Sequence, residues 1–378
     1  MAGPPARDDE TTIPDPPPPD AASGSWRRPL AGIGRVRPPR YSAIWVATGL
    51  LFAFSPLLAS NSLTKAALLS MLPFAALLAI ASVGQTLVIQ QRGLDLTVPG
   101  MILLTTVILT QHAAGHGSRL PVAILLVVVA CVASGLFSGI AITQFGITPL
   151  VATLGVNALL IGTVYQLTSG QATATSPAGL VNFASHKTLG IPNTAVIAVI
   201  AVVIAAILLR TTVLGRRFVA VGASPAAARA AGIRVNVYLV TTYVLASLAY
   251  GLTGILFAGY FSTPGLSAGS DYLLPTIAAV VLGGTSLAGG TGSVIATAVG
   301  AVFLTQLQQI LTANGAALSV EYIIQGSIIA AGMLLRNVPW RRLWAHIAAG
   351  MAPPAGGSAQ LAAAMPEPLT GATAERES

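Results

Sequence analysis

The sequence predicts an all-α fold, a polytopic membrane protein of about ten transmembrane helices. Of its 378 residues, 54% are hydrophobic and only 8% are charged, and the mean hydropathy is +0.78, which a water-exposed globular surface cannot match. Between Tyr41 and Leu335 the apolar runs are interrupted only by short breaks. Many of these runs approach the length of about 20 residues that a helix needs to cross a bilayer. Lipid must therefore cover most of the surface.

Cutting the chain at polar and Gly/Pro breaks gives ten apolar segments. The predicted spans are 41–60, 66–90, 97–112, 120–142, 148–168, 193–210, 237–260, 273–288, 292–312 and 319–335. They form one membrane domain, 41–335. A proline-rich and basic segment, 1–40, precedes this domain, and a segment that is first basic and then alanine-rich, 336–378, follows it. Both compositions are typical of disordered tails.

The basic residues predict the orientation in the membrane. The break after the sixth span holds Arg210, Arg216, Arg217, Arg229 and Arg234, and further arginines flank the domain at 27–40 and 336–342. The breaks on the opposite side hold only Lys65, Arg119 and Lys187. By the positive-inside rule, both termini and the loop 211–236 are cytoplasmic in a multi-pass protein of a bacterial plasma (inner) membrane. Because topology explains the net charge of +8, no nucleic-acid partner is expected.

Two of the predicted spans are short and interrupted. The third follows Gly-Leu-Asp-Leu-Thr-Val-Pro-Gly at 93–100, and the eighth runs into a glycine-rich stretch at 283–290. If the ten spans are divided five and five, these two are the third members of halves with opposite orientation, which is typical of an inverted repeat. Helix-breaking residues persist at membrane depth where protein or water satisfies the freed backbone groups, so we expect both spans to line a central cavity.

The polar residues at these breaks are the candidates for a translocation pathway. They are Asp95, Thr97, Gly283, Gly284, Thr285 and Ser286. An ionisable residue near a bilayer is costly and is usually kept for a task. Two structural alternatives stay open: Asp95 and Thr97 can cap the third helix, with Arg92 as a partner of Asp95, and the glycines can serve close helix packing.

The sequence also excludes several kinds of chemistry. The central parts of the spans contain no Asp, Glu, Lys or Arg, which argues against an ion-coupled secondary transporter. The chain lacks a phosphate-binding Gly-x-x-x-x-Gly-Lys-Ser/Thr loop and a His-Glu-x-x-His zinc motif, and we predict no catalytic, cofactor or metal site. His112 and His116 are expected in a solvated loop without a third ligand, and Cys131 is expected to be a packing residue. A membrane-embedded enzyme is therefore disfavoured, and energy for uphill transport must come from another subunit.

The loop 211–236 contains the start and stop signals of a short helix. Ser224 can cap its start, Pro225 suits its first turn, and Gly232 can end it. A helix of this length is not stable alone, so we expect it to dock on something, either the membrane domain itself or a partner.

Four stretches of the chain resemble the ribose-type permease family of ATP-binding-cassette (ABC) importers. They are 84–89 with Gly-Leu-Asp-Leu-Thr-Val at 93–98, Ala-Thr-Leu-Gly at 152–155, 214–223 with 227–233, and the glycine-rich 277–292. They occur in the family's order, and the resemblance covers roughly residues 66–335. Arg92 departs from the pattern, because a glycine is usual at that position.

The resemblance implies a permease that works as a dimer with an identical or sister permease. It also implies a cytosolic ABC ATPase subunit that binds and hydrolyses ATP, an external solute-binding protein, and a small sugar of the ribose or monosaccharide type as the solute. The loop 211–236 would be the coupling element, with Gly215, Arg216, Gly222, Arg229 and Gly232 contacting the ATPase. A permease for branched-chain amino acids or another small solute is the nearest alternative.

Overall fold

The computed structural model describes residue 3 and residues 41–113, 116–171 and 174–337. Apart from Gly3, all of these belong to one compact unit. The tail 1–40, except Gly3, and the tail from residue 338 onward, with Arg341 and Arg342, lie outside the described residues. Within the described part, helices make up nearly all of the regular structure, as the sequence predicts.

Each of the ten predicted spans overlaps one helix. These helices are α1 (Ser42–Leu58), α2 (Lys65–Gln90), α3 (Val98–Val107), α4 (Leu120–Gln144), α5 (Pro149–Thr168), α7 (Asn193–Thr211), α10 (Val235–Phe261), α11 (Leu273–Leu282), α12 (Val294–Ala313) and α13 (Leu318–Asn337). Among the described residues, α2, α4, α5, α7, α10 and α12 are long and apolar enough to cross a membrane, and the other four are shorter apolar helices.

Two boundaries differ from the prediction. The third span continues past α3 as a π-helical turn, Ile108–His112, so His112 is helical rather than part of a loop, although its side chain is exposed. The eighth span was predicted to reach residue 288, but α11 ends at Leu282. Gly284, Gly289 and Gly290 adopt positive φ angles, which are incompatible with continuing a right-handed helix.

The remaining elements are short and lie between the long helices. They are α6 (Ala178–Ser185), the hairpin strands β1 (Lys187–Thr188) and β2 (Ile191–Pro192), α8 (Val213–Ala223), α9 (Pro225–Ala230), and the 3-10 turns at Gly117–Arg119 and Ser270–Tyr272. The predicted short helix is confirmed as α9. Ser224 Oγ accepts a hydrogen bond from the Ala227 amide at 3.3 Å, and Gly232 follows at a φ of 77°.

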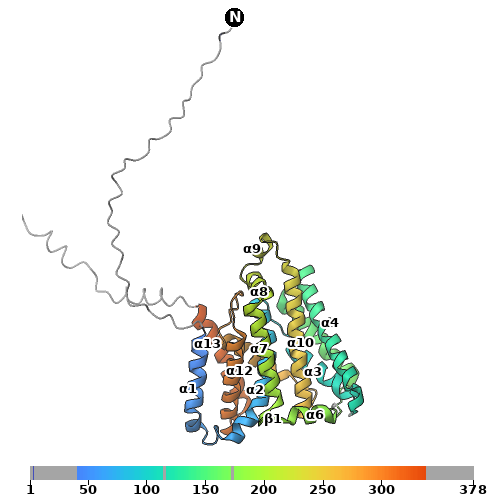
Figure 1. Cartoon of the computed structure of the whole chain (residues 1–378), viewed down its shortest axis with the longest axis vertical. Coiled ribbons are helices and arrows are strands. Elements are labelled where there is room, and N and C mark those ends of the chain that lie inside the picture. The colour runs from blue at the N-terminus through green and yellow to red at the C-terminus, as the bar shows by residue number, and fades with distance from the viewer. Residues whose placement is uncertain (1–2, 4–40, 114–115, 172–173, 338–378) are drawn as a thin grey trace, which may run out of the picture. The chain divides into compact units, whose positions relative to one another are not determined.

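Helix α2 lies at the centre of the bundle. Every residue from 75 to 90 is buried, which fits a helix enclosed on all sides. Helices α7, α10, α11 and α12 pack against it. Figure 1 shows α8 and α9 at one end of the bundle and β1 and α6 at the other, so the arginine-rich loop and Lys187 lie at opposite ends. Helix α10 begins at the α9 end, and α2 ends there, so the two central helices run antiparallel.

The packing relates the two halves to each other. Helix α10 packs against α3 and α4 in the way that α2 packs against α11 and α12. Likewise α3 packs against α5, and α11 packs against α13. Exchanging α2–α5 with α10–α13 therefore preserves these contacts, in agreement with a five-and-five division. Helices α1 and α7 depart from the exchange, because α1 packs against α12 and α7 against α2.

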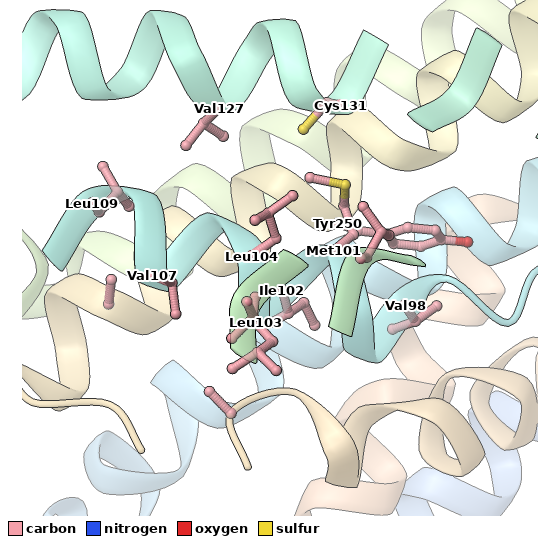
Figure 2. Close-up of a cluster of buried hydrophobic side chains, with 14 of the residues drawn as sticks. Val98, Met101, Ile102, Leu103, Leu104, Val107, Leu109, Val127, Cys131 and Tyr250 are labelled. Atoms are coloured by element: carbon pink, nitrogen blue, oxygen red, sulfur yellow. The ribbon is translucent and has the colours of Figure 1, made fainter. Parts of the chain in front are cut away.

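Small residues allow the closest helix contacts. A Cβ atom added at Gly139 of α4 would lie 2.7 Å from Val240 Cα of α10, and one added at Gly135 would be closer still to Val244 Cα. Cys131 is buried and faces Gly251, so the packing role predicted for the thiol is confirmed. Figure 2 shows Cys131 and Val127 of α4 facing the side chains of α3, with Tyr250 of α10 beside them. The interrupted helix α3 thus packs closely against α10 and α5, and α4 contacts the π-helical turn that follows it.

Candidate functional site

Asp95 shapes the entrance to α3. Its Oδ1 accepts hydrogen bonds from the Thr97 amide at 2.9 Å and from Thr97 Oγ1 at 2.7 Å. Both residues are 1% exposed. Since α3 begins at Val98, Asp95 holds the turn that leads into the helix and does not cap an amide of its first turn. The Thr97 hydroxyl is used for a hydrogen bond within the same turn.

Two tyrosines of α10 enclose this turn. The hydroxyl of the buried Tyr250 donates to Gln85 Oε1 of α2 at 2.9 Å and lies beside the Asp95 carboxylate. Tyr243 lies earlier in α10, and its hydroxyl occupies the space that a Cβ at Gly93 would need. The carboxylate is therefore fixed between α2, α3 and α10, where a local change of charge or size would be felt by all three helices.

The candidates at the end of α11 lie against α12. A Cβ at Gly283 would lie 2.7 Å from both Thr297 N and Thr297 Cα, so this glycine serves the close helix packing that was one of the two readings. Gly284 has a φ of 76°, and the Ser286 amide donates to Thr291 O at 2.8 Å, which closes the loop. Thr285 is buried, and its Oγ1 has no hydrogen-bond partner among the described residues.

These two groups of candidates lie on different sides of α2. Gln85 bonds to Tyr250 on the α10 side, and its neighbour Thr86 donates to Thr297 Oγ1 on the α12 side at 3.1 Å. The structure therefore places Asp95 and Thr97 near α10, and Gly283 near α12. They meet indirectly, through the last turns of α2.

Three backbone segments converge at the end of α2. We call this the glycine junction, and it comprises Gln90, Arg92, Gly222, Ala223 and 289–292. The Gly290 amide donates to Gln90 O at 2.8 Å. A Cβ at Gly222 would lie 3.1 Å from Gly290 N and much closer to Gln90 O, and a Cβ at Gly290 would lie 2.6 Å from Ala223 Cα. The end of α8 is thus in main-chain contact with the ends of both α2 and the α11–α12 loop.

Arg92 fastens this junction. Its φ is 64°, a left-handed conformation that favours glycine and explains why a glycine suits the position. The arginine adds what glycine cannot: Nε donates to Gly222 O at 2.9 Å, and Nη2 donates to Ala223 O. These carbonyls end α8, where a cation also interacts favourably with the helix dipole. Arg92 is not a partner of Asp95 in any hydrogen bond or ion pair of the described residues.

Two more polar contacts support the same end of the bundle. Gln91 Nε2 donates to Phe218 O of α8 at 2.8 Å, and Arg210 Nη2 at the end of α7 donates to Ser293 Oγ at the start of α12 at 3.2 Å. Sequence reasoning did not name Gln90, Gln91 or Arg92 among the candidate site residues, although all three make contacts at this end of the bundle. The sequence did contain a signal for Arg92, because a glycine is usual at this position in the family that the chain resembles.

The five residues predicted for coupling divide into two groups. Arg216, Arg229 and Gly232 are exposed on α8, on α9 and after α9, and they are available to a partner. Gly215 and Gly222 are buried. A Cβ at Gly215 would meet the Leu208 and Leu209 carbonyls, so this glycine allows the tight turn between α7 and α8.

A cavity of about 300 Å³ opens at the other end of the bundle, which we call the aromatic cavity. Its lining residues are Phe74, Leu78, Phe257, Phe261, Thr263, Pro264, Gly265, Ser267, Ala268, Gly269, Asp271, Tyr272, Pro275, Thr305, Gln308 and Glu321. Helices α2, α10, α11, α12 and α13 all contribute residues, and so does the segment that connects α10 to α11. Sequence reasoning named none of them, because they lie far apart in the chain.

The described residues offer no group of three or more His, Cys, Asp or Glu side chains that could hold a metal ion. His116, like His112, is exposed. The described geometry provides a cavity of about 300 Å³ at one end, a tightly packed junction at the other, and two interrupted helices between them.

Comparison with known proteins identifies the family and two relatives of the chain. Residues 67–333 match a family described as the permease component of branched-chain amino acid transport systems. The ribose import permease protein RbsC of Escherichia coli strain K12 is 33% identical over 296 residues, which cover 77% of this chain and 92% of that protein. The autoinducer 2 import system permease protein LsrD of the same strain is 32% identical over 270 residues, covering 70% and 81%. No solved structure matches the chain.

Proposed function

Since the chain belongs to the family of permease components of branched-chain amino acid transport systems, we propose that it is the membrane-spanning subunit of an ABC importer for a small sugar. One observation carries the sugar assignment: the chain aligns with 92% of a ribose import permease at 33% identity. The second relative is named for the import of autoinducer 2 rather than an amino acid. A branched-chain amino acid remains the alternative solute because of the family's description.

Partners supply what the permease needs for uphill transport. A separate cytosolic ABC ATPase binds and hydrolyses ATP, an external solute-binding protein delivers the sugar, and a second permease, identical or a sister chain, completes the pathway. Large apolar side chains such as Leu125 and Phe137 of α4 and Leu159 of α5 are more than half exposed, and these faces contact lipid or the second permease. Both termini and α8–α9 are cytoplasmic.

The exposed residues of α8 and α9 form the contact with the ATPase. Arg216 and Arg229 are exposed cations suited to an acidic cleft, and Gly232 ends the short helix α9, which carries Arg229. A short helix seated in such a cleft converts closure of the ATPase into a rigid-body movement. Gly215 and Gly222 contribute from within, because they let α8 pack tightly against the membrane helices.

Movement of α8 then reaches the translocation pathway through the glycine junction. Main-chain contacts and the Arg92 side chain join the end of α8 to the segments that precede α3 and follow α11. Closely packed backbone has low compressibility, so a displacement of α8 is transmitted to these two segments. The candidates Asp95, Thr97, Gly283, Gly284, Thr285 and Ser286 border the pathway at these breaks and change its width when α3 and α11 shift.

The first experiment is purification of the tagged full chain, co-expressed with the ATPase and binding-protein genes, followed by uptake assays in proteoliposomes. We expect a nucleotide-binding subunit to co-purify and ATP to drive uptake of D-ribose. Uptake of leucine without ribose would favour the amino-acid alternative. An ATPase-free protein that transports under an ion gradient would overturn the importer assignment.

Replacing Arg229 with alanine tests the coupling contact in the same preparation. The side chain is exposed, so stability should change by less than about 0.5 kcal/mol. We expect weaker retention of the ATPase and slower ATP-driven uptake. Lys187→Ala, an exposed cation at the opposite end, is the matched control and should retain the ATPase fully. Full uptake by the Arg229→Ala protein would contradict its role.

A further inference from the structure

The aromatic cavity reaches into the bundle and is more than a surface hollow. Phe74, which lines it, is the tenth residue of α2, about 14 Å along the helix from Lys65. Phe74 is 37% exposed, whereas every residue from 75 to 90 is buried. The cavity therefore ends against the central helix, at the level where the buried part of α2 begins.

Two of the three carboxylates of the membrane domain lie at this cavity. Residues 41–337 contain three carboxylates, Asp95, Asp271 and Glu321, and the last two line the cavity. None of the described lining residues is Lys, Arg or His, so neither carboxylate is neutralised by a cation within the cavity. Asp271 lies in the turn before α11 and Glu321 in the first turn of α13, so both carboxylates lie at helix starts at this end of the bundle.

Neighbouring side chains hold both carboxylates in place. Asp271 Oδ1 accepts hydrogen bonds from Tyr322 Oη at 3.0 Å and from Ser270 Oγ at 3.2 Å. Among the described residues, Asp271 Oδ2 has no donor. Glu321 Oε1 accepts from Gln325 Nε2 at 3.0 Å, and the Gln308 side chain lies beside this carboxylate. Each acidic group is thus oriented before a ligand arrives, which lowers the entropy lost on binding.

Aromatic rings form the apolar part of the lining. Phe261 is 38% exposed, much like Phe74, and the centroids of these two rings are 6.0 Å apart. Phe257 packs against Phe261 at 4.4 Å and against Tyr272 at 6.0 Å. The rings fix one another, so the cavity presents firm apolar faces next to oriented hydrogen-bond acceptors. This combination is typical of sites for small polar ligands with apolar faces.

From these contacts we propose that the aromatic cavity binds one neutral, polyhydroxylated solute molecule on its way into the pathway. The carboxylates of Asp271 and Glu321 accept hydrogen bonds from hydroxyl groups, the Gln308 amide adds a donor, and Phe74 and Phe261 pack against C–H faces. A cavity of about 300 Å³ suits a monosaccharide. Two uncompensated carboxylates disfavour a solute with a carboxylate or phosphate group. The inference rests on the proposed function and specifies its substrate class and site.

Saturation-transfer difference NMR on the purified full chain in lipid nanodiscs tests this site without partner subunits. D-Ribose is the probe, and leucine and choline are the comparison ligands. We expect transfer to ribose, and about tenfold weaker binding for Asp271→Asn, in line with the loss of hydrogen bonds to a charged group. Phe74→Ala should also weaken binding several-fold. Phe137→Ala is the matched control, because Phe137 lies on α4 outside the cavity.

The outcomes distinguish failure of the proposed binding site from failure of the proposed function. If Asp271→Asn lowers the yield of folded protein, Gln308→Ala provides a second measurement, since Gln308 is exposed within the cavity. Equal ribose binding by the wild type and all cavity variants would overturn the site, even if the assembled importer takes up ribose. Choline binding that ribose does not displace would show a cation site instead. Leucine uptake without ribose uptake by the importer would overturn the proposed function itself.

Discussion

The two ends of α11 differ in how they are built. At its start, Asp271 and Tyr272 border a cavity of about 300 Å³ whose lining is aromatic and polar. At its end, Gly283 and the loop 289–292 touch α12, α2 and α8 so closely that added Cβ atoms would collide with backbone. One end leaves space for a ligand, and the other leaves none for a methyl group.

This difference assigns separate tasks to the two ends. A cavity can tolerate changes in its lining without loss of packing, because solvent or ligand fills the space. A backbone junction cannot, because interiors are close-packed and transmit strain. Substitutions at the junction should therefore act on folding and coupling, and substitutions at the cavity should act on solute binding with little effect on stability.

The largest effect is expected at the junction from Gly222→Val. The new side chain would collide with Gln90 O and crowd Gly290 N, which costs about 1–3 kcal/mol of stability or more. We expect a lower apparent melting temperature and a smaller monodisperse fraction in size-exclusion chromatography. Gly155→Ala is the control, because nothing lies within 4 Å of a Cβ at that position. A Gly222→Val protein of unchanged stability would mean that the junction is not closely packed.

A second, smaller effect separates the two contributions of Arg92. Arg92→Ala removes both hydrogen bonds to the end of α8 and keeps a positive φ, whereas Arg92→Gly removes the bonds and suits that φ. We expect the glycine variant to be more stable than the alanine variant by about 1 kcal/mol. Both should show reduced uptake relative to ATP hydrolysis in the assembled importer. Wild-type coupling in both variants would show that Arg92 does not link α8 to the interrupted helices.

The turn before α3 gives the next effect. Asp95→Ala removes the acceptor for the Thr97 amide and hydroxyl, at a cost of about 1 kcal/mol. We expect a lower folded yield without a change of solute preference. Asp95→Asn, which keeps an acceptor oxygen, should recover part of the yield. Altered selectivity in a well-folded Asp95→Ala protein would instead make Asp95 a residue that contacts the solute.

The smallest stability effect is expected at the cavity. Gln308→Ala removes an exposed amide, so the free energy of unfolding should change by less than about 0.5 kcal/mol. The measurement is the apparent melting temperature. The comparison between the two ends of α11 predicts that this variant melts like the wild type. A destabilisation as large as that of Gly222→Val would contradict the division between an open and a closed end.

Sequence reasoning reached the helices more successfully than the site. Apolar runs located the ten helices α1–α5, α7 and α10–α13, and Ser224, Pro225 and Gly232 located α9, because these signals are local. The end of α11 was missed, since a glycine run can pack inside a helix or break it, and only the surrounding backbone decides. Gly222 was grouped with Arg229 as a residue that contacts the ATPase, but Gly222 is buried in α8, whereas Arg229 of the next helix is exposed.

The sequence by itself determined the membrane-spanning class, the positions of the apolar helices, the asymmetry of basic residues and the two interrupted spans. These follow from length, hydropathy and local backbone preference, which each segment carries alone. Only the tertiary structure decided that Arg92 bonds to the end of α8, and that Phe74, Asp271 and Glu321 line one cavity. Both depend on segments distant in the chain, and hydropathy does not encode which helix faces which.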